Sequence, residues 1–180
     1  MREASGTEIM SELLWWQFSY FYPMKDFSHI DAQGNPVMVD VGQKAVTRRT
    51  AHAQSIVRLP DVVVAQFQHK DIQTKKGPVF QTAIIAGTMA TKRTDELIPL
   101  CHSLGLDSCH LTIELIGHDA VIDCTVATEG KTGVEMEALV GVSVAALTVY
   151  DMCKALSHDI IITETKLMAK AGGKRDFLRG

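Results

Sequence analysis

The stretch GKTGVEMEALVGVSVAALTVYDMCKAL, residues 130–156, decides how the rest of the chain folds. After the turn at residues 130–133, only Gly141 interrupts a run of helix-forming residues, and one interior glycine costs about 1 kcal/mol. Between Glu137 and Asp151 there is no charged residue, so the helix is apolar on nearly all sides and has to be buried. Because this uncharged run is shorter than the roughly 20 residues that span a membrane, we predict one long core helix of a soluble protein over residues 134–156.

The charged residues of this helix lie at its two ends, with Glu135 and Glu137 in the first turn and Asp151 and Lys154 in the last. Glu137 and Asp151 point to within about 40° of each other, but the helical rise between them is roughly 21 Å. One small site on one chain cannot easily use both ends. Either the ligand is long, or two subunits combine to build each site.

Asp151 and Lys154 allow two interpretations. As an exposed ion pair three residues apart, they would stabilise the helix by about a few tenths of a kcal/mol. Their neighbours Val149, Met152 and Cys153 are apolar, however, and in such surroundings the pKa of a lysine can fall. Local chemistry alone leaves both the structural and the functional role open.

The composition bounds the class of protein. A chain of 180 residues suits one domain with a sizeable core. The net charge is −3 and the basic residues are scattered, so the sequence does not predict a basic surface patch that would bind nucleic acid. An anionic ligand therefore has to be held by a local pocket. The four cysteines lack the spacing of a secreted disulfide scaffold and no signal peptide is recognisable, so we expect a reducing cytoplasm and no membrane partner.

Residues 1–27 differ from the rest, because LLWWQFSYFYPM contains six of the eleven aromatic residues of the chain. Two explanations remain open. The segment is either an added element that covers an apolar surface, or the product of an upstream start, with Met24 as the first residue of the working protein.

The remaining chain alternates between strand and helix patterns. The expected elements are a short strand at 36–41, a strand at 44–59, a helix at 60–68, a loop at 75–78, a helix at 79–93, a hairpin of strands at 106–116 and 120–128, and a last strand at 159–170. With the long helix, this order favours an α+β fold, a ferredoxin-like antiparallel sheet with helices packed on one face.

Two isolated motifs are set aside. The Gly130-Lys131-Thr132 stretch has the tail of a phosphate-binding P-loop, but Thr125 stands where that motif needs glycine. A zinc site built on Cys109 and His110 is disfavoured, because neighbours on a strand face opposite sides. We expect no metal-binding residue.

Three stretches taken together are more specific than any single motif: KKGPVFQTAIIAGTMATKRTDELIPLCHSL (75–104), EGKTGVEMEALVGVSVAALTVYDMCKAL (129–156) and LMAKAGGKRDF (167–177). In order and spacing they resemble the molybdenum cofactor biosynthesis protein C family, the cyclic pyranopterin monophosphate synthases. The resemblance makes residues 28–177 a single catalytic domain, preceded by an extension of unknown role at 1–27 and followed by a tail at 178–180.

The resemblance implies a lyase that converts 3′,8-cyclo-7,8-dihydroguanosine 5′-triphosphate into cyclic pyranopterin monophosphate and pyrophosphate. It implies a homohexamer, a trimer of dimers with sites at the dimer interfaces. It implies no organic cofactor and leaves open whether Mg²⁺ accompanies the triphosphate. The alternative is a non-catalytic nucleotide-binding regulatory module on the same scaffold, since a fold does not fix a function.

The resemblance also assigns residues. Asp151 is the catalytic acid and Lys154 its general acid/base partner. The groups around the base and sugar are Leu100, Cys101, His102, Met136 and Glu137, and the triphosphate cradle is Lys76, Arg49, Lys92, Arg93 and Lys170. This assignment requires Asp151 and Lys154 to lie within reach of a bound polyphosphate rather than in bulk water.

The chain departs from the family pattern at two places. Ser103 follows LCH, where the family usually has proline, and the GGKRDF tail is shorter than the family's form. The second departure leaves open whether Lys174 is a phosphate contact.

Overall fold

The computed structural model describes residues 30–31 and 33–180, so the predictions on residues 1–27 and on Met24 lie outside the described residues. The chain divides into two compact units, 1–39 and 40–180. Within the described part of the first unit, Ile30 and Pro36 form a single antiparallel bridge. The strand expected at 36–41 is wrong, because residues 37–41 have no regular structure and the chain becomes extended and paired only from Thr47.

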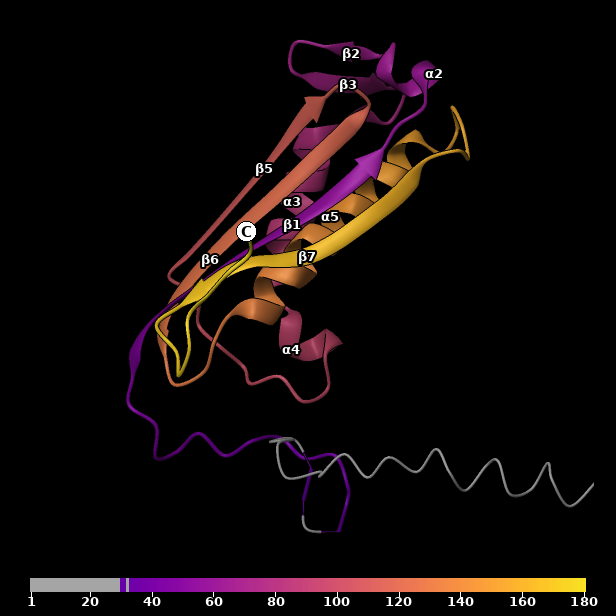
Figure 1. Cartoon of the computed structure of the whole chain (residues 1–180). Helices are drawn as coiled ribbons and strands as arrows, with labels where there is room; N and C mark the ends of the chain where they lie inside the picture. The colour runs from indigo at the N-terminus through magenta and orange to yellow at the C-terminus, as the bar shows by residue number, and fades with distance from the viewer. Residues whose placement is uncertain (1–29, 32) are drawn as a thin grey trace, which may run out of the picture. The chain divides into compact units, whose positions relative to one another are not determined.

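The main sheet has five antiparallel strands in the order β5-β6-β1-β7-β8 (Figure 1). The central strand β1 pairs along its whole length with β6 on one side, and from Thr50 onward with β7 on the other. The strands are β1 (Thr47–Arg58), β5 (Ser108–Ile116), β6 (Asp119–Gly130), β7 (Ile161–Ala171) and β8 (Phe177–Leu178). The predicted hairpin is confirmed, with Ile116 paired to Asp119 across a turn that contains Gly117 at a φ of 63°.

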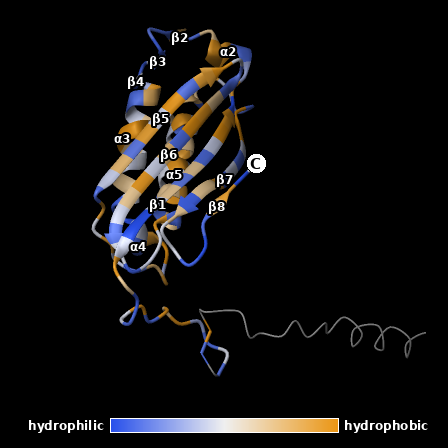
Figure 2. Ribbon diagram, turned by 60° about the vertical axis from the view of Figure 1, so that its left-hand side comes forward, coloured by the Kyte–Doolittle hydropathy of each residue, from blue (hydrophilic) through white to orange (hydrophobic). Residues whose placement is uncertain are grey.

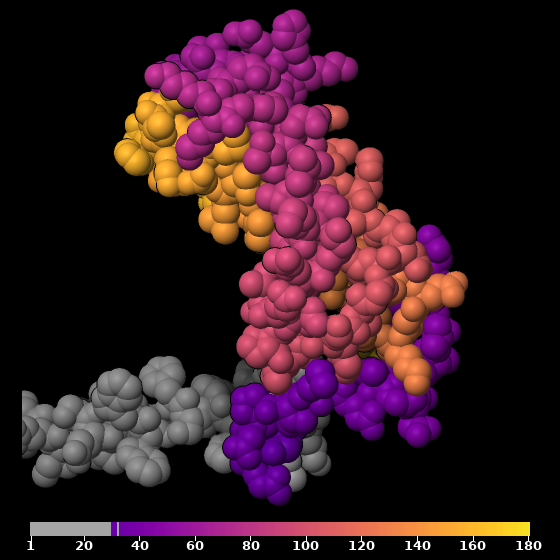
Figure 3. Space-filling view, turned by 180° about the vertical axis from the view of Figure 1, so that it is seen from behind, coloured from indigo at the N-terminus to yellow at the C-terminus, as the bar shows by residue number. Residues whose placement is uncertain are grey.

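Two long helices cover one face of this sheet. Helix α5 (Glu135–Cys153) lies over β1, β6 and β7, and α3 (Val79–Thr91) lies beside it over β5. Figure 3, a view from behind, shows α3 on the face of the sheet that the helices cover. The succession β1-α3-β5-β6-α5-β7 is the ferredoxin-like unit, so the predicted fold class is confirmed.

Alternation along the strands builds the core. On β1, every second residue from 51 to 57 is buried, namely Ala51, Ala53, Ser55 and Val57, while the residues between them are more exposed. Figure 2 shows the resulting alternation of polar and apolar residues along the strands. Among the described residues, α5 is the one helix long and apolar enough to cross a membrane, but ten of its residues are buried in this core, which confirms the predicted core helix.

Helices α3 and α5 meet at two glycines. A Cβ on Gly87 would lie 2.7 Å from the carbonyl oxygen of Gly141, and a Cβ on Gly141 would lie 2.7 Å from Cγ2 of Thr91. Gly141 lowers the intrinsic helix stability of α5, but the close approach of the two helices requires it.

The expected helix at 60–68 is wrong beyond its first turn. Helix α2 (Asp61–Val64) is followed by a small sheet of β2 (Phe67–Gln68), β3 (Asp71–Thr74) and β4 (Gly77–Pro78). His69 and Lys70 both have positive φ and form the two-residue turn of a hairpin. Neither His nor Lys is a typical residue of such a turn, so the sequence pattern did not predict this hairpin.

The Asp71 carboxylate fixes this small sheet to α3. It accepts the backbone N–H groups of Ile72 at 2.6 Å, Phe80 at 2.7 Å and Gln81 at 3.1 Å. The helix has Pro78 at its N-cap position, which supplies no side-chain cap. Asp71, distant in sequence, satisfies the donors of the first turn instead.

Candidate active site

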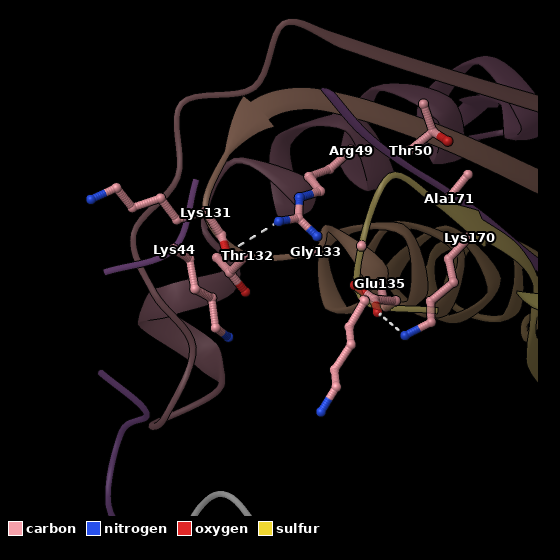
Figure 4. A pocket seen from close by; sticks show the side chains of 11 residues that line it. Lys44, Arg49, Thr50, Lys131, Thr132, Gly133, Glu135, Lys170 and Ala171 are labelled. Carbon is pink, nitrogen blue, oxygen red and sulfur yellow. Dashed lines mark hydrogen bonds and ion pairs between the residues drawn. The ribbon is translucent and has the colours of Figure 1, made fainter. Parts of the chain in front are cut away.

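A cationic pocket of about 210 Å³ opens near the first turn of α5 (Figure 4). The basic side chains that line it come from β1, from β7 and from three loop segments: Lys44, Arg49, Lys131, Lys170 and Lys174. Glu135 is the one acidic residue among its described lining residues, so the lining carries a formal charge of +4. A cluster of this kind suits a ligand with several negative charges.

The polar contacts inside the cationic pocket involve two of these cations directly. The Arg49 guanidinium points toward the turn after β6, where it donates to the carbonyl oxygens of Gly130 at 3.4 Å and Lys131 at 3.5 Å (Figure 4). Lys170 Nζ lies 2.8 Å from Glu135 Oε1. An entering phosphate would compete with these long or screened contacts and gain charge-assisted hydrogen bonds.

The Lys131 side chain links the pocket wall to the segment before β1. Its Nζ donates to the carbonyl oxygen of Gly42 at 2.6 Å, and the Gly42 N–H in turn donates to Asp40 Oδ1 at 2.7 Å. This contact holds the loop that carries Lys44 beside the turn after β6. Lys44 and Lys131 are pocket residues that the sequence analysis did not identify.

Two glycines allow this wall to form. A Cβ on Gly133 would lie 1.8 Å from the Glu135 carboxylate, and a Cβ on Gly172, whose φ is +84°, would lie 1.8 Å from the Arg48 carbonyl oxygen. Glycine is therefore required at position 172, whereas a side chain at position 133 would force the Glu135 carboxylate to turn aside.

Glu137 lies in the same turn of α5 and is buried, with 4% of its surface exposed. Burial raises the pKa of Glu137, and the nearby Glu135 and Asp95 carboxylates raise it further. Burial first, and then the Glu137 and Asp95 charges, raises the pKa of Cys101. The structure thus brings Glu137 and the Leu100–His102 segment to this end of α5.

Lys92 and Arg93 do not line the cationic pocket. They are exposed at the end of α3, between Thr91 and the short helix α4 (Thr94–Leu97), and Arg93 borders a separate groove with Met89 and Leu97. Their predicted role in a triphosphate cradle is not supported by a shared cavity within one chain.

The predicted catalytic pair lies at the other end of α5. Lys154 Nζ is 2.7 Å from Asp151 Oδ1, and Lys76 Nζ is 3.0 Å from Asp151 Oδ2 and 3.0 Å from its backbone oxygen. Hydrogen bonds from Lys154 and then Lys76 lower the pKa of Asp151, and the same contact with Asp151 raises the pKa of Lys154. The expectation that apolar neighbours lower the lysine pKa is wrong, because the head group reaches solvent and meets a carboxylate.

One chain alone does not unite these two places. The side chains of Asp151 and Lys154 are 55% and 48% exposed, and neither lines the cationic pocket. Glu135 and Asp151 are separated by about 24 Å of helical rise. The structure brings Lys76 to Asp151 and Lys154, and brings Arg49 to Lys170, but it keeps the two groups apart.

The described residues contain no group of three or more His, Cys, Asp or Glu side chains placed to hold a metal ion.

Comparison with known proteins places this arrangement in a family. The sequence profile of the MoaC family matches residues 38–173. A cyclic pyranopterin monophosphate synthase of Xanthomonas axonopodis pv. citri (strain 306) is 56% identical, over 83% of this chain and 92% of the relative. Molybdenum cofactor biosynthesis protein 1 of Dictyostelium discoideum is 50% identical over 83% of this chain, which spans only 26% of that relative. The resemblance in sequence is confirmed, and the chain belongs to the MoaC family.

Proposed function

We propose that the chain is a cyclic pyranopterin monophosphate synthase, a lyase of molybdenum cofactor biosynthesis. Its substrate is then the 3′,8-cyclised dihydroguanosine triphosphate, and its products are cyclic pyranopterin monophosphate and pyrophosphate. The observation that carries the proposal is the pair of features on α5, a carboxylate–ammonium pair at one end and a pocket of formal charge +4 at the other. A non-catalytic nucleotide binder would need the pocket but not the pair, so the alternative is not favoured.

In this proposal the cationic pocket holds the triphosphate. Arg49 and Lys170 contact it directly, and Lys44, Lys131 and Lys174 add charge around it. A triphosphate carries about four negative charges, which the formal charge of the lining matches. Mg²⁺ accompanying the triphosphate is compatible with this arrangement, and no organic cofactor is required by the reaction.

The base and sugar then lie against Leu100, Cys101, His102, Met136 and Glu137. A buried carboxyl with a raised pKa keeps its proton to higher pH than a solvated one, so Glu137 is suited to donate a proton to the substrate. Hydrogen bonds from two ammonium groups keep Asp151 ionised, so in this proposal it is the proton acceptor and not the catalytic acid that the resemblance implied, and Lys154 is the donor.

We further propose that each site is built by two subunits of a cytoplasmic homohexamer. The separation of about 24 Å along α5 argues that one chain contributes the cationic pocket and another contributes Asp151, Lys154 and Lys76. A subunit interface over the exposed pair would also remove the solvent that now screens it. The four cysteines present as free thiols fit the reducing compartment.

The test is pyrophosphate release from the cyclised triphosphate. We expect Lys154→Ala and Asp151→Asn each to reduce turnover at least about a hundredfold while the protein still binds triphosphate, because general acid–base groups contribute about that much. Lys166→Ala is the matched control, since it removes a surface ion pair of the same 2.7 Å length at Glu164, and it should retain activity. If the unaltered protein binds the triphosphate but releases no pyrophosphate, the proposal is wrong and the chain is a non-catalytic nucleotide-binding module.

A further inference from the structure

Two cysteines that the proposed chemistry does not use lie side by side under the helices. Cys109 on β5 is paired with Val126, and Cys124 on β6 is paired with Leu111, so the two cysteines are diagonal neighbours on the same face of the sheet. Their Sγ atoms are 4.0 Å apart. A disulfide needs about 2.05 Å between the sulfurs, so closing the pair requires both side chains to rotate and the two strands to draw closer together.

The two thiols differ in their surroundings. Cys124 is fully buried, while Cys109 is partly exposed. The Thr91 hydroxyl contacts Cys109 Sγ at 3.6 Å. The hydrogen bond from the Cys124 thiol lowers the pKa of Cys109, which burial opposes, and the Thr91 and Thr88 hydroxyls lower it further. Cys109 is therefore the thiol of the pair that carries thiolate character.

The other two cysteines lack such a partner arrangement. Burial and the Glu137 charge raise the pKa of Cys101, and burial raises the pKa of Cys153 to about 11. Among the four thiols, which all lie within the described residues, one pair places a partly exposed cysteine 4.0 Å from a second thiol that could resolve it.

We propose that Cys109 and Cys124 form a peroxide-oxidisable dithiol, in which Cys109 reacts first and Cys124 resolves it. The Cys109 thiolate attacks one oxygen of hydrogen peroxide, the O–O bond breaks, and the leaving hydroxide takes up a proton to become water. Cys109 is then a sulfenic acid, oxidised by two electrons. The Cys124 sulfur attacks the Cys109 sulfur, the S–O bond breaks, and the departing hydroxide combines with the Cys124 proton as a second water.

Closure of this pair reaches the helices that carry the candidate site. Cys124 Sγ lies where a Cβ on Gly141 would be only 3.0 Å away, and Thr91, which contacts Cys109, packs against the same glycine. Movement of the sulfurs toward each other therefore changes the packing of Cys109 against Thr91 at the end of α3. Thr91 is directly followed by Lys92 and Arg93, so oxidation alters the segment that leads to α4.

The experiment treats the reduced full-length chain with a few equivalents of hydrogen peroxide, denatures it in iodoacetamide and measures its mass. We expect two of the four thiols to escape alkylation, a peptide map to show Cys109 linked to Cys124 within one chain, and dithiothreitol to restore all four. Peroxide that first oxidises Cys101 or Cys153, or that leaves Cys109 fully alkylated, would overturn the proposal.

Variants separate the two roles. Cys124→Ala should stop the reaction at a sulfenic acid on Cys109, which dimedone traps, whereas Cys109→Ala should leave Cys124 reduced. Cys153→Ala, a buried cysteine outside the pair, is the matched control and should still form the link. Dimedone labelling of Cys124 in place of Cys109 would contradict the assigned order. The unaltered chain gives the decisive map even if a variant fails to fold.

Discussion

Glu137 is a carboxyl group buried in the first turn of α5, close to two other carboxylates. In the unfolded chain the same group is solvated and titrates near its ordinary pKa. Burial of the ionised form of Glu137 therefore lowers the free energy of unfolding. We infer that this carboxyl is buried for its function, which is to hold a proton in the site.

The raised pKa of Glu137 predicts a pH-dependent effect of Glu137→Gln. Below the unfolded pKa, the group is protonated in both states and costs nothing. As pH rises through the window between the unfolded and the raised folded pKa, the native protein pays an increasing penalty for ionisation. We expect Glu137→Gln to match the unaltered protein in thermal unfolding near pH 4 and to unfold at a higher temperature at pH 8, while losing pyrophosphate release. A stability difference that shrinks as pH rises would contradict the burial of this charge.

Asp71 is a buried carboxylate with a structural role. Since it accepts two backbone N–H groups at the start of α3 and that of Ile72 on β3, Asp71→Ala should lower the free energy of unfolding by about 1–3 kcal/mol. Chemical denaturation measures the loss, and exposed Asp107→Ala serves as the control that should change little. Equal stability of the two variants would show that α3 begins without this cap.

At the scale of elements, the contact between α3 and α5 depends on the absence of side chains at two positions. Gly87→Ala would place a Cβ 2.5 Å from Leu111 Cδ1 and 2.7 Å from the Gly141 carbonyl oxygen. The helices would have to move apart, so the gain in helix propensity is outweighed and we expect a loss of about 1–3 kcal/mol. Gly105→Ala is the control, because a Cβ there meets nothing within 4 Å. Urea unfolding of both variants measures the difference, and equal stability of the two would contradict so close a helix crossing.

At the scale of the whole molecule, α5 behaves as a spacer between two chemical groups. Its apolar body fills the core over β1, β6 and β7, so neither end can move toward the other. An assembly in which the end of one α5 meets the start of another would complete two sites at once, as two-fold symmetry requires.

This arrangement predicts complementation between two inactive variants. Arg49→Ala damages the cationic pocket, and Lys154→Ala damages the catalytic pair. If each site combines the two ends from different chains, random mixing of subunits leaves about one quarter of the sites free of both changes. We therefore expect dissociated and reassembled mixtures to recover about a quarter of the unaltered pyrophosphate release.

Mixtures of Lys154→Ala with Asp151→Asn provide the control, because both changes fall on the same end of one chain and no intact site can form. Recovery in neither mixture would mean that one chain supplies both ends of its own site. Light scattering on the same samples shows whether the subunits associate at all.

The sequence predicted the parts of this fold that depend on local periodicity. Three of these parts can be recognised from a few neighbouring residues. They are the uncharged run of α5, the alternation along β1, β5, β6 and β7, and the turn at Gly117. The small sheet β2-β3-β4 was missed because it depends on a turn at His69 and Lys70 that carries no typical turn residue. Asp71 was missed as well, since the N–H groups it accepts lie up to ten positions along the chain.

For the site, the sequence by itself determined which chemical groups are present and that the two ends of α5 are far apart, because helical rise is fixed by residue count. Only the tertiary structure decided which cations meet. Lys44, Arg49, Lys131, Lys170 and Lys174 come from segments separated by up to 130 residues and converge because β1 lies between β6 and β7. The tertiary structure also decided that Lys76 reaches Asp151, while Lys92 and Arg93 lie away from the cationic pocket. The physical reason is that strand order and helix packing, rather than spacing along the chain, set the distances between charges.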